Sequence, residues 1–286
     1  MKIETEVARR AVPQSEKTNE AVNTGPRRQT PAVSVSNVTH NFLLDKGAEK
    51  RGIEALHAVN LEVPAHQFVA LVGPSGCGKT TLLNMVAGLL TPHTGTIEVL
   101  GQPPKSGRRD IAYMLARDAL LPWRTALENV MFGLEVRGIN DRRRRQQRAR
   151  EMLRVVGLEG FHDAYRTELS QGMRQRVALA RTFALPSDVL LMDEPFGALD
   201  PQRKIQLGQV LLGLWEKEPR TVLFVTHDLH EAIALADRVI VMNPRPGHIA
   251  EDVLIDLPRP RSIRDLQTEP KFHALYSRIW EVLNHE

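Results

Sequence analysis

Cysteine is almost absent from this sequence, since Cys77 is the only one among 286 residues. A single thiol excludes an internal disulfide and fits a reducing compartment. Aromatic residues make up only 5% of the chain, and no run of eighteen uncharged apolar residues occurs. A polytopic membrane protein is therefore excluded, because a helix needs about 20 apolar residues to cross a bilayer. The first ten residues include acidic side chains and no apolar segment, so they do not predict a secretion signal.

The composition that remains is typical of a globular protein. Apolar residues account for 42% and charged residues for 25%, in a chain long enough to bury a large core. The net charge is only +4, yet seven arginines and one aspartate lie between Arg137 and Arg150. A solvated helix face is the simplest interpretation of this basic run. Contact with nucleic acid, anionic lipid or an acidic partner is the alternative.

Changes in the hydrophobic pattern along the chain predict its division into structural segments. Residues 1–31 are polar, contain three prolines and show no period, so we expect a disordered N-terminal tail. Alternating segments at 32–42 and 53–63 predict an antiparallel β unit. Short apolar runs predict buried parallel strands, and each run is followed by a helical pattern. These runs lie at 66–73, 189–193, 221–226 and 238–242, and the clearest helical patterns lie at 80–90, 201–217 and 229–236.

Strand signals vanish between about residues 117 and 186, where the chain is rich in arginine and has a helical pattern. We interpret this stretch as a helical subdomain inserted into the α/β domain, which extends over residues 32–286. A β-like segment and a proline-rich turn follow residue 244, and a final amphipathic helix is expected near 268–284. Strands that alternate with helices predict an α/β fold with a mixed central sheet.

Residues 73–80 read Gly-Pro-Ser-Gly-Cys-Gly-Lys-Thr, the G-x-x-x-x-G-K-[ST] pattern of a phosphate-binding loop. The glycines let successive backbone N–H groups turn inward toward phosphate oxygens, and the following helix adds its N-terminal dipole. Lys79 can reach the β- and γ-phosphates, and the Thr80 hydroxyl can bind Mg²⁺. A chance glycine-rich turn would not be flanked by a strand and a helix. Cys77 occupies a variable position and is interpreted as a small filler.

Asp193 and Glu194 follow the apolar strand VLLM, at the edge of a parallel sheet where ligands bind. We expect Asp193 to hold Mg²⁺ directly or through water, and Glu194 to polarise the water that attacks the γ-phosphate. A helix cap is the alternative role for these carboxylates, because acidic residues often end strands in that way.

Three further segments resemble ABC-type ATPases. ELSQGMRQRVALARTFA (168–184) is similar to the signature of that family, MDEPFGALD (192–200) follows it, and VTHDLHEA (225–232) is similar to its switch-histidine region. The resemblance covers residues 32–286. The segments at 119–123, 173–181 and 243–261 are most similar to ATP-binding subunits of bacterial nitrate, sulfonate and taurine importers.

The resemblance implies an ATPase with ATP and Mg²⁺ at its site. Phe42 would stack on adenine, Ser170 and Gly172 would cap the γ-phosphate held by a second copy, and His227 would contact that phosphate. A core strand position for Phe42 and a helix-capping neighbourhood for His227 are the structural alternatives. The implied catalytic residues are Glu194, His227 and Lys79, and the metal residues are Thr80 and Asp193. The implied nucleotide contacts are Phe42, Gly73, Pro74, Ser75, Gly76, Cys77, Gly78, Lys79, Thr80, Thr81, Ser170, Gly172 and Asp200.

Two positions depart from the family pattern. Ala116 stands where the family has a glutamine that reaches Mg²⁺ and the attacking water, and alanine has no such group. Arg117 and Asp118 are the nearby polar candidates for that role. Gln171 replaces a signature glycine, and it would cost about 1 kcal/mol or more if the backbone there required positive φ. We expect ATP hydrolysis, with a slow or coupled rate.

The family further implies a second copy that completes an ATP sandwich, transmembrane permease subunits, and indirectly a solute-binding protein. It places the chain peripherally at the cytoplasmic face of the cell membrane and implies no nucleic acid. The transported solute would be a small oxyanion such as nitrate, an alkanesulfonate or taurine.

A soluble ABC-type ATPase acting on nucleic acid or the ribosome remains the alternative, supported by the basic run alone. A small-molecule kinase would explain the phosphate loop but not the signature. Trp123 is either a residue near the membrane contact or a buried core residue.

Overall fold

The computed structural model describes residues 30–46, 49–116, 118–197, 199–244 and 246–284. The tail predicted for residues 1–31 lies outside the described residues as far as residue 29, and so does Arg117. None of the helices in the described ranges is both long and apolar enough to span a membrane.

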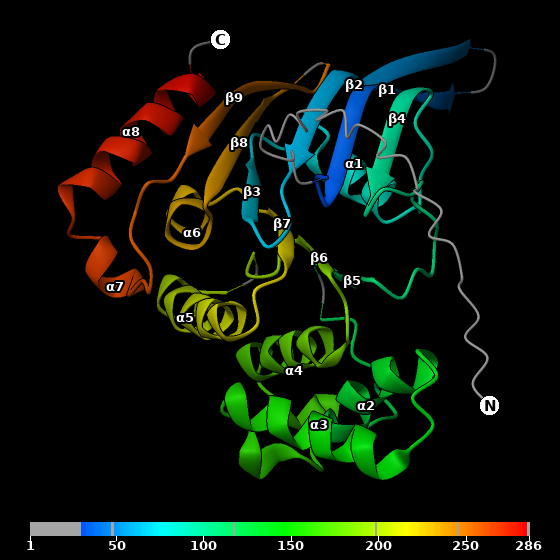
Figure 1. The fold of residues 1–286 in the computed structure, drawn as a ribbon, viewed down its shortest axis with the longest axis vertical. Coiled ribbons are helices and arrows are strands. Elements are labelled where there is room, and N and C mark those ends of the chain that lie inside the picture. The colour runs from blue at the N-terminus through cyan, green and yellow to red at the C-terminus, as the bar shows by residue number, and fades with distance from the viewer. Residues whose placement is uncertain (1–29, 47–48, 117, 198, 245, 285–286) are drawn as a thin grey trace, which may run out of the picture.

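The strands form one small and one large sheet (Figure 1). The small sheet is antiparallel in the order β2-β1-β4. The large sheet has the order β5-β6-β7-β3-β8-β9 and is parallel except for β9, which pairs antiparallel with β8. The bounds are β1 Val33–Lys46, β2 Glu49–Val63, β3 Phe68–Val72, β4 Thr94–Val99, β5 Ile111–Met114, β6 Val189–Asp193, β7 Thr221–Val225, β8 Arg238–Asn243 and β9 His248–Leu254.

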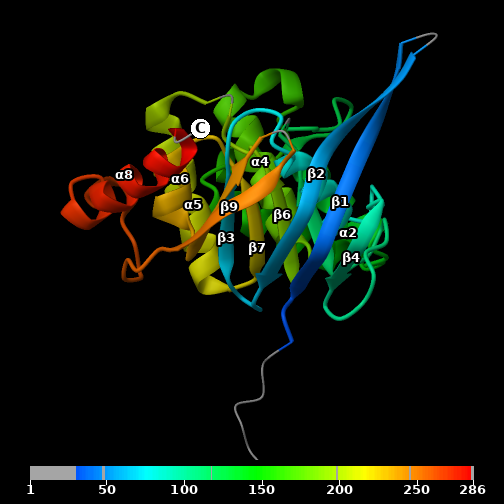
Figure 2. The same ribbon diagram turned by 90° about the horizontal axis from the view of Figure 1, so that it is seen from above.

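Eight α-helices accompany these sheets within the described part of the chain. Figure 2 shows the large sheet between the small sheet on one side and α5, α6 and α8 on the other. Helices α2, α3 and α4 form a separate group at the opposite end from the small sheet (Figure 1). The bounds are α1 Lys79–Val86, α2 Ala126–Val136, α3 Arg142–Val155, α4 Gln171–Ala184, α5 Pro201–Lys217, α6 Leu229–Leu235, α7 Ile263–Leu266 and α8 Pro270–Asn284.

The central strands β3, β6 and β7 are buried on both faces, which explains their uninterrupted apolar sequences. Successive residues of β3 serve two different cores. Phe68 and Ala70 face the core beneath α5 and α6, whereas Val69 and Leu71 face the core that contains α1 and the small sheet. This alternation follows from the two-residue period of a strand. The large sheet therefore separates the two cores.

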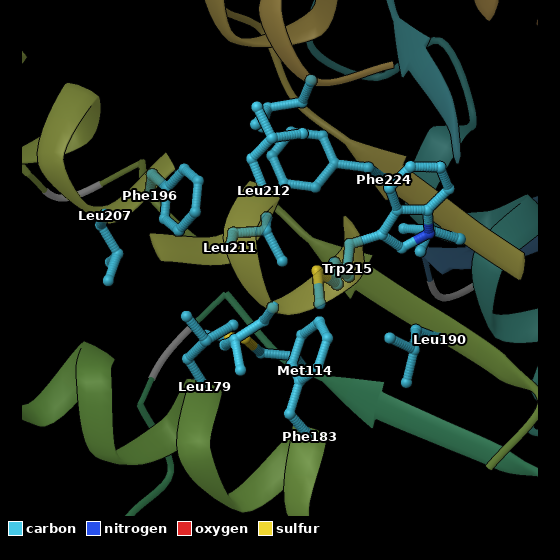
Figure 3. Close-up of a cluster of buried hydrophobic side chains, with 14 of the residues drawn as sticks. Met114, Leu179, Phe183, Leu190, Phe196, Leu207, Leu211, Leu212, Trp215 and Phe224 are labelled. Atoms are coloured by element: carbon cyan, nitrogen blue, oxygen red, sulfur yellow. The ribbon is translucent and has the colours of Figure 1, made fainter. Parts of the chain in front are cut away.

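The core between α4, α5 and the large sheet is built from large apolar side chains (Figure 3). Phe183 of α4 and Trp215 of α5 meet the side chains of Leu190 on β6 and Phe224 on β7. The Trp215 indole N–H donates to the Arg220 carbonyl oxygen at 2.7 Å, so its polar atom is satisfied. This packing fixes the end of the helical group against the sheet.

The helical group has clear sequence signals at its helix starts. Thr125 and Glu128 form a capping box at α2, and Asp141 caps α3 by accepting from the N–H groups of Arg143 and Arg144. Helix α3 buries Ala149, Met152 and Leu153 and leaves most of its arginines toward solvent. The basic run is thus the solvated face of an amphipathic helix.

The fold class predicted from the sequence is confirmed. The chain is α/β, with a mixed central sheet, an antiparallel β subdomain and an inserted helical group. The proline-rich turn after β9 packs more deeply than its composition indicates. Arg261 is 4% exposed, and burial lowers the pKa of its guanidinium to about 10. Arg261 donates to the carbonyl oxygens of Ala236 at 2.7 Å and Leu257 at 3.0 Å, which anchors the C-terminal helices to the sheet.

Candidate functional site

The phosphate loop connects β3 to α1 at the carboxyl end of the central parallel strand. Gly78 has a left-handed backbone with φ of 94°, and a Cβ there would lie 2.4 Å from Leu56 Cδ2. A Cβ on Gly73 would lie 2.2 Å from the carbonyl oxygen of Met242. Glycine is therefore required at both positions, because the loop turns tightly between β2 and β8.

Lys79 is the first residue of α1, and it is 6% exposed. Its ammonium donates to the carbonyl oxygens of Gly73 at 2.7 Å and Pro74 at 3.0 Å. These bonds hold the charge over the loop, where successive N–H groups and the helix N-terminus favour an anion. Cys77 is fully buried with its sulfur 3.6 Å from the ammonium, as expected of a small filler.

The second residue of α1 contacts the carboxylate expected to hold a metal. The Thr80 hydroxyl donates to Asp193 Oδ1 at 3.0 Å, which joins α1 to the end of β6. Asp193 is 8% exposed, and burial raises the pKa of its carboxyl. The charge of Glu194 raises that pKa further, while the Thr80 hydrogen bond and the charge of Lys79 oppose the rise. A hydroxyl and a buried carboxylate side by side form the oxygen donor set that Mg²⁺ prefers.

Glu194 follows Asp193 in a strained conformation. Its φ is 44°, in the left-handed region that a residue with a side chain rarely adopts. The Glu194 N–H donates to the Val225 carbonyl oxygen at 2.9 Å, so β7 holds the strained residue in place. Such strain persists only where the surroundings enforce it, and it is concentrated at functional sites.

The switch histidine lies beside this glutamate. His227 Nδ1 is 3.5 Å from Glu194 Oε2, and the two side chains are 54% and 37% exposed. Both therefore reach solvent, where a substrate can meet them. The structure brings Lys79, Thr80, Asp193, Glu194 and His227 together at the carboxyl ends of β3, β6 and β7, which are neighbours in the sheet. That edge is where ligands bind in parallel sheets.

Ser170 and Asp200 lie at the N-termini of α4 and α5, outside the phosphate loop. Both are N-caps: Ser170 accepts from the Met173 N–H at the start of α4, and Asp200 accepts from the Arg203 N–H at the start of α5. A hollow of about 170 Å³ adjoins Ser170, and none of its lining residues comes from the phosphate loop. It is lined by Ser170, Gly172, Met173, Arg176, Leu199, Arg203, Gln206 and Leu207. The signature residues thus form a second surface, separate from the loop.

Phe42 lies on β1 in the hairpin with β2, opposite Ile53. It is 42% exposed, so the alternative of a core strand residue is wrong. Its ring packs edge-on against His40 at a centroid distance of 4.8 Å. His40 pairs with Leu56, whose side chain lies against Gly78, so Phe42 is two residues along β1 from the pair that adjoins the phosphate loop. Among the remaining predicted loop residues, Pro74, Ser75 and Gly76 are exposed at the turn, and Thr81 is half-buried in α1.

The two departures from the family pattern have different structural contexts. Gln171 is the first residue of α4 and has no positive φ, so its side chain causes no backbone strain. Ala116 is exposed in a bend after β5. Asp118 is occupied elsewhere, because its carboxylate accepts from Arg174 Nε at 3.0 Å and Arg166 Nε at 3.3 Å. We conclude that Asp118 braces the helical group, so it is not a free substitute for the missing glutamine.

Trp123 precedes α2 and is 70% exposed, so a buried core position is wrong. It lines a groove of about 640 Å³ on the helical group. Arginines of α3 line the same groove, namely Arg142, Arg145 and Arg150. An exposed indole beside several cations is a composition typical of protein interfaces.

A group of charged residues next to His227 is not apparent from the sequence. Lys204 of α5 lies 3.0 Å from Asp228 and 3.1 Å from Glu231, both of which follow the histidine. The acidic residues were visible in the sequence, but their cationic partner lies 24 positions away from Asp228 on another helix. No local pattern signals such a contact.

Comparison with known proteins agrees with the fold. The ABC transporter family matches residues 56–197. An uncharacterized ABC transporter ATP-binding protein of Methanocaldococcus jannaschii is 47% identical over 234 residues, which is 82% of this chain and 86% of that protein. The chain therefore belongs to the ABC transporter family, and it is an ATPase coupled to transport.

More specific relatives are importer subunits. The taurine import ATP-binding protein TauB of Rhizobium johnstonii is 41% identical over 238 residues, covering 82% of this chain and 90% of that protein. Among solved structures, the ATP-binding cassette MJ0796, a dimer in a post-hydrolysis state bound to ADP and Pi, has a TM-score of 0.68 and 32% identity. It covers 79% of this chain and 100% of that chain. The resemblance to ATP-binding subunits of the nitrate, sulfonate and taurine importer type is confirmed.

Proposed function

We propose that two copies of this chain bind two ATP molecules between them and hydrolyse them to drive a bacterial importer of a small oxyanion. The observation that carries this proposal is the convergence of Lys79, Thr80, Asp193, Glu194 and His227 at one sheet edge. Support for the solute class comes from relatives named as taurine import proteins. Nitrate, an alkanesulfonate and taurine itself belong to that class.

The residues of the site divide the work. Lys79 and the N–H groups of the phosphate loop bind the β- and γ-phosphates, and the ring of Phe42 stacks on adenine. Glu194 accepts a proton from the attacking water, and His227 contacts the γ-phosphate oxygen that gains charge. Asp193 and Thr80 would hold Mg²⁺, which supplies positive charge to the phosphates when bound.

The second surface completes the arrangement in a dimer. Ser170, with the N-terminus of α4, offers a hydroxyl and a positive dipole to an anion but lies apart from its own phosphate loop. We propose that Ser170 and Gly172 of one copy cap the γ-phosphate held by the other, while Asp200 lies where the two sites meet. Support comes from the dimeric state of the structural relative.

The membrane side of the proposal rests on the groove of the helical group. Trp123 gives this groove an aromatic anchor, and its charged lining consists of four arginines with Glu128, Glu135 and Asp163. We place there the contact with a transmembrane permease subunit, through which the chain is held at the cytoplasmic face of the membrane. A solute-binding protein would meet the permease on the other side.

Replacement of Glu194 by glutamine tests the proposal. The Glu194→Gln variant keeps the shape of the side chain but cannot accept the proton, so it should bind ATP while kcat falls by at least about 100-fold. With MgATP it should form a stable dimer, detectable by light scattering. Glu281→Gln, at an exposed position on α8, is the control and should behave like the unaltered chain. An unchanged kcat, or a monomer in saturating MgATP, would contradict the proposal.

A further inference from the structure

A half-buried ionic cluster adjoins the segment that carries His227. Lys204 of α5 extends its ammonium to Asp228 Oδ2 at 3.0 Å and Glu231 Oε1 at 3.1 Å, both belonging to the α6 segment. The three side chains are only 14%, 25% and 10% exposed, respectively. A half-buried lysine between two carboxylates loses part of its hydration, so its position needs a reason beyond surface solubility.

The cluster holds the residues on both sides of His227. The Thr226 hydroxyl donates to Glu231 Oε2 at 2.7 Å, and it also accepts the N–H of Asp228 at 3.0 Å. Asp228 Oδ1 caps α6 by accepting the His230 N–H at 3.0 Å. The residues before and after the histidine are therefore both tied to the same ion pair.

Lys204 also ties this segment to the start of α5. Its backbone N–H donates to the Asp200 carbonyl oxygen at 3.0 Å, so the lysine lies one helical turn after the residue expected where two copies meet. The first turn of α5 and the histidine segment thus share one side chain. Through it, the place of His227 beside Glu194 depends on α5.

The charges of the cluster make Lys204 its central member. Burial raises the pKa of Glu231, and the charge of Asp228 adds to that rise. Burial also acts to raise the pKa of Asp228, but the hydrogen bond and charge of Lys204 bring that pKa below its ordinary value. Without the lysine, two half-buried carboxylates would repel each other. The segment between them would then move.

We propose that Lys204 is a positioning residue for hydrolysis: by binding Asp228 and Glu231 it holds His227 in reach of Glu194 and the γ-phosphate. This inference rests on the proposed function, in which His227 contacts that phosphate. Lys204 itself contacts neither His227 nor the phosphate. Its effect on the reaction therefore passes through the backbone of residues 226–228.

Lys204→Met is the primary test, with steady-state ATP hydrolysis by the full chain as the assay. We expect kcat to fall by at least about tenfold, while KM for ATP changes by less than about twofold, because the phosphate loop is untouched. Lys204→Arg should restore most of kcat, since a guanidinium can bind both carboxylates. A brace that only stabilises the fold would not produce this split between kcat and KM.

A matched ion pair elsewhere in the molecule provides the control. Arg259 and Asp237 are 21% and 25% exposed and lie 2.7 Å apart, at the opposite end of β8 from the nucleotide site. Arg259→Met should lower the melting temperature but leave kcat per folded molecule unchanged. If Lys204→Met behaved in the same way, the positioning role would be overturned.

Double variants distinguish the remaining outcomes. In a His227→Ala background, Lys204→Met should cause no further loss of kcat, because both changes act on one group. Additive losses would overturn the inference. If Lys204→Met folds poorly, Lys204→Met with Glu231→Gln removes the charge imbalance, and kcat should remain low although stability recovers. Recovery of kcat in that pair would also overturn it. An unchanged kcat in His227→Ala alone would instead refute the role of His227 in the proposed function.

Discussion

Two helix N-termini in this molecule face anions in the proposed reaction, and they are built in opposite ways. Helix α1 begins inside a glycine-rich loop, with no side-chain cap and a lysine bound to the loop carbonyl oxygens. Helix α4 begins at an exposed serine that caps its own helix, beside an open hollow. The first is an enclosure that one chain completes alone. The second is a surface that encloses a ligand only when another body covers it.

This difference explains why substitutions in the phosphate loop and substitutions around Ser170 should have different effects. The phosphate loop is fixed by steric contacts with β2 and β8, so its shape is determined within the chain. The surface around Ser170 depends on the arrangement of α4 and α5. Substitutions in the first region should abolish binding in any assembly. Substitutions in the second should be rescued by an intact partner copy.

Mixing two inactive variants should give the largest effect. Lys79→Ala removes the ammonium of the loop, and Ser170→Arg blocks the second surface, so each alone should lower ATPase activity by about 100-fold or more. A mixed dimer contains one site with both intact residues. Equal mixing should therefore restore about a quarter of the normal rate, since half the dimers are mixed and each has one working site.

The controls for this experiment are the two variants assayed separately and Lys105→Ala, an exposed lysine outside the loop. Recovery that grows with total protein concentration would support the shared site. A mixture no more active than its components would break the comparison, because Ser170 would then not act across copies.

Restoring a glutamine at the junction of the two halves is the second test. Ala116 is exposed after β5, and the nearby Asp118 is bound to Arg166 and Arg174. Ala116→Gln should raise kcat by about tenfold, because the new amide can orient the attacking water. The measurement is phosphate release at saturating ATP. Ala116→Asn, whose side chain is one carbon shorter, should give a smaller gain, and equal rates in both variants and the unaltered chain would contradict the prediction.

The smallest effect concerns the stability of the helical half alone. Asp118→Asn weakens charge-assisted hydrogen bonds to Arg166 and Arg174, and should lower the free energy of unfolding by about 1–3 kcal/mol. Denaturant unfolding followed by circular dichroism measures this change. Nucleotide affinity should stay the same, because the phosphate loop is not involved.

Asp163→Asn, at an exposed position near α2, should leave the unfolding midpoint unaltered. A loss of ATP affinity in Asp118→Asn as large as its loss of stability would show that the two halves are not separable in this way.

The sequence predicts the buried strands well, because a strand that is buried on both faces consists of consecutive apolar residues. Strands β6 and β7 are apolar runs because they have no solvent-facing side, and β3 is a similar apolar run just before the phosphate loop. The sequence does not indicate strand β4, because it has only two buried residues, Ile97 and Val99, at the edge of the small sheet. Helix α1 ends at Val86 and not at residue 90, because Gly88 takes a left-handed conformation beside the backbone of Lys105.

The candidate site was predictable where one short segment carries its chemistry. The phosphate loop and the pair Asp193–Glu194 are contiguous, so spacing alone indicates them. The contact of Lys204 with Asp228, and the exposure of Trp123, result from how distant elements pack. No local period encodes either of them. The strained φ of Glu194 is likewise a product of its hydrogen bond to β7.

The strand order has a consequence for how the chain is made. Strand β3 ends before residue 73, yet its two neighbours in the sheet, β7 and β8, begin at residues 221 and 238. On a ribosome, the loop after β3 therefore emerges long before the strands that hold it. The small sheet, complete at residue 99, is ready much earlier. A nascent chain halted at about residue 200 would carry the full glycine-rich motif and still lack affinity for ATP, because a strand without neighbours cannot fix the loop that follows it.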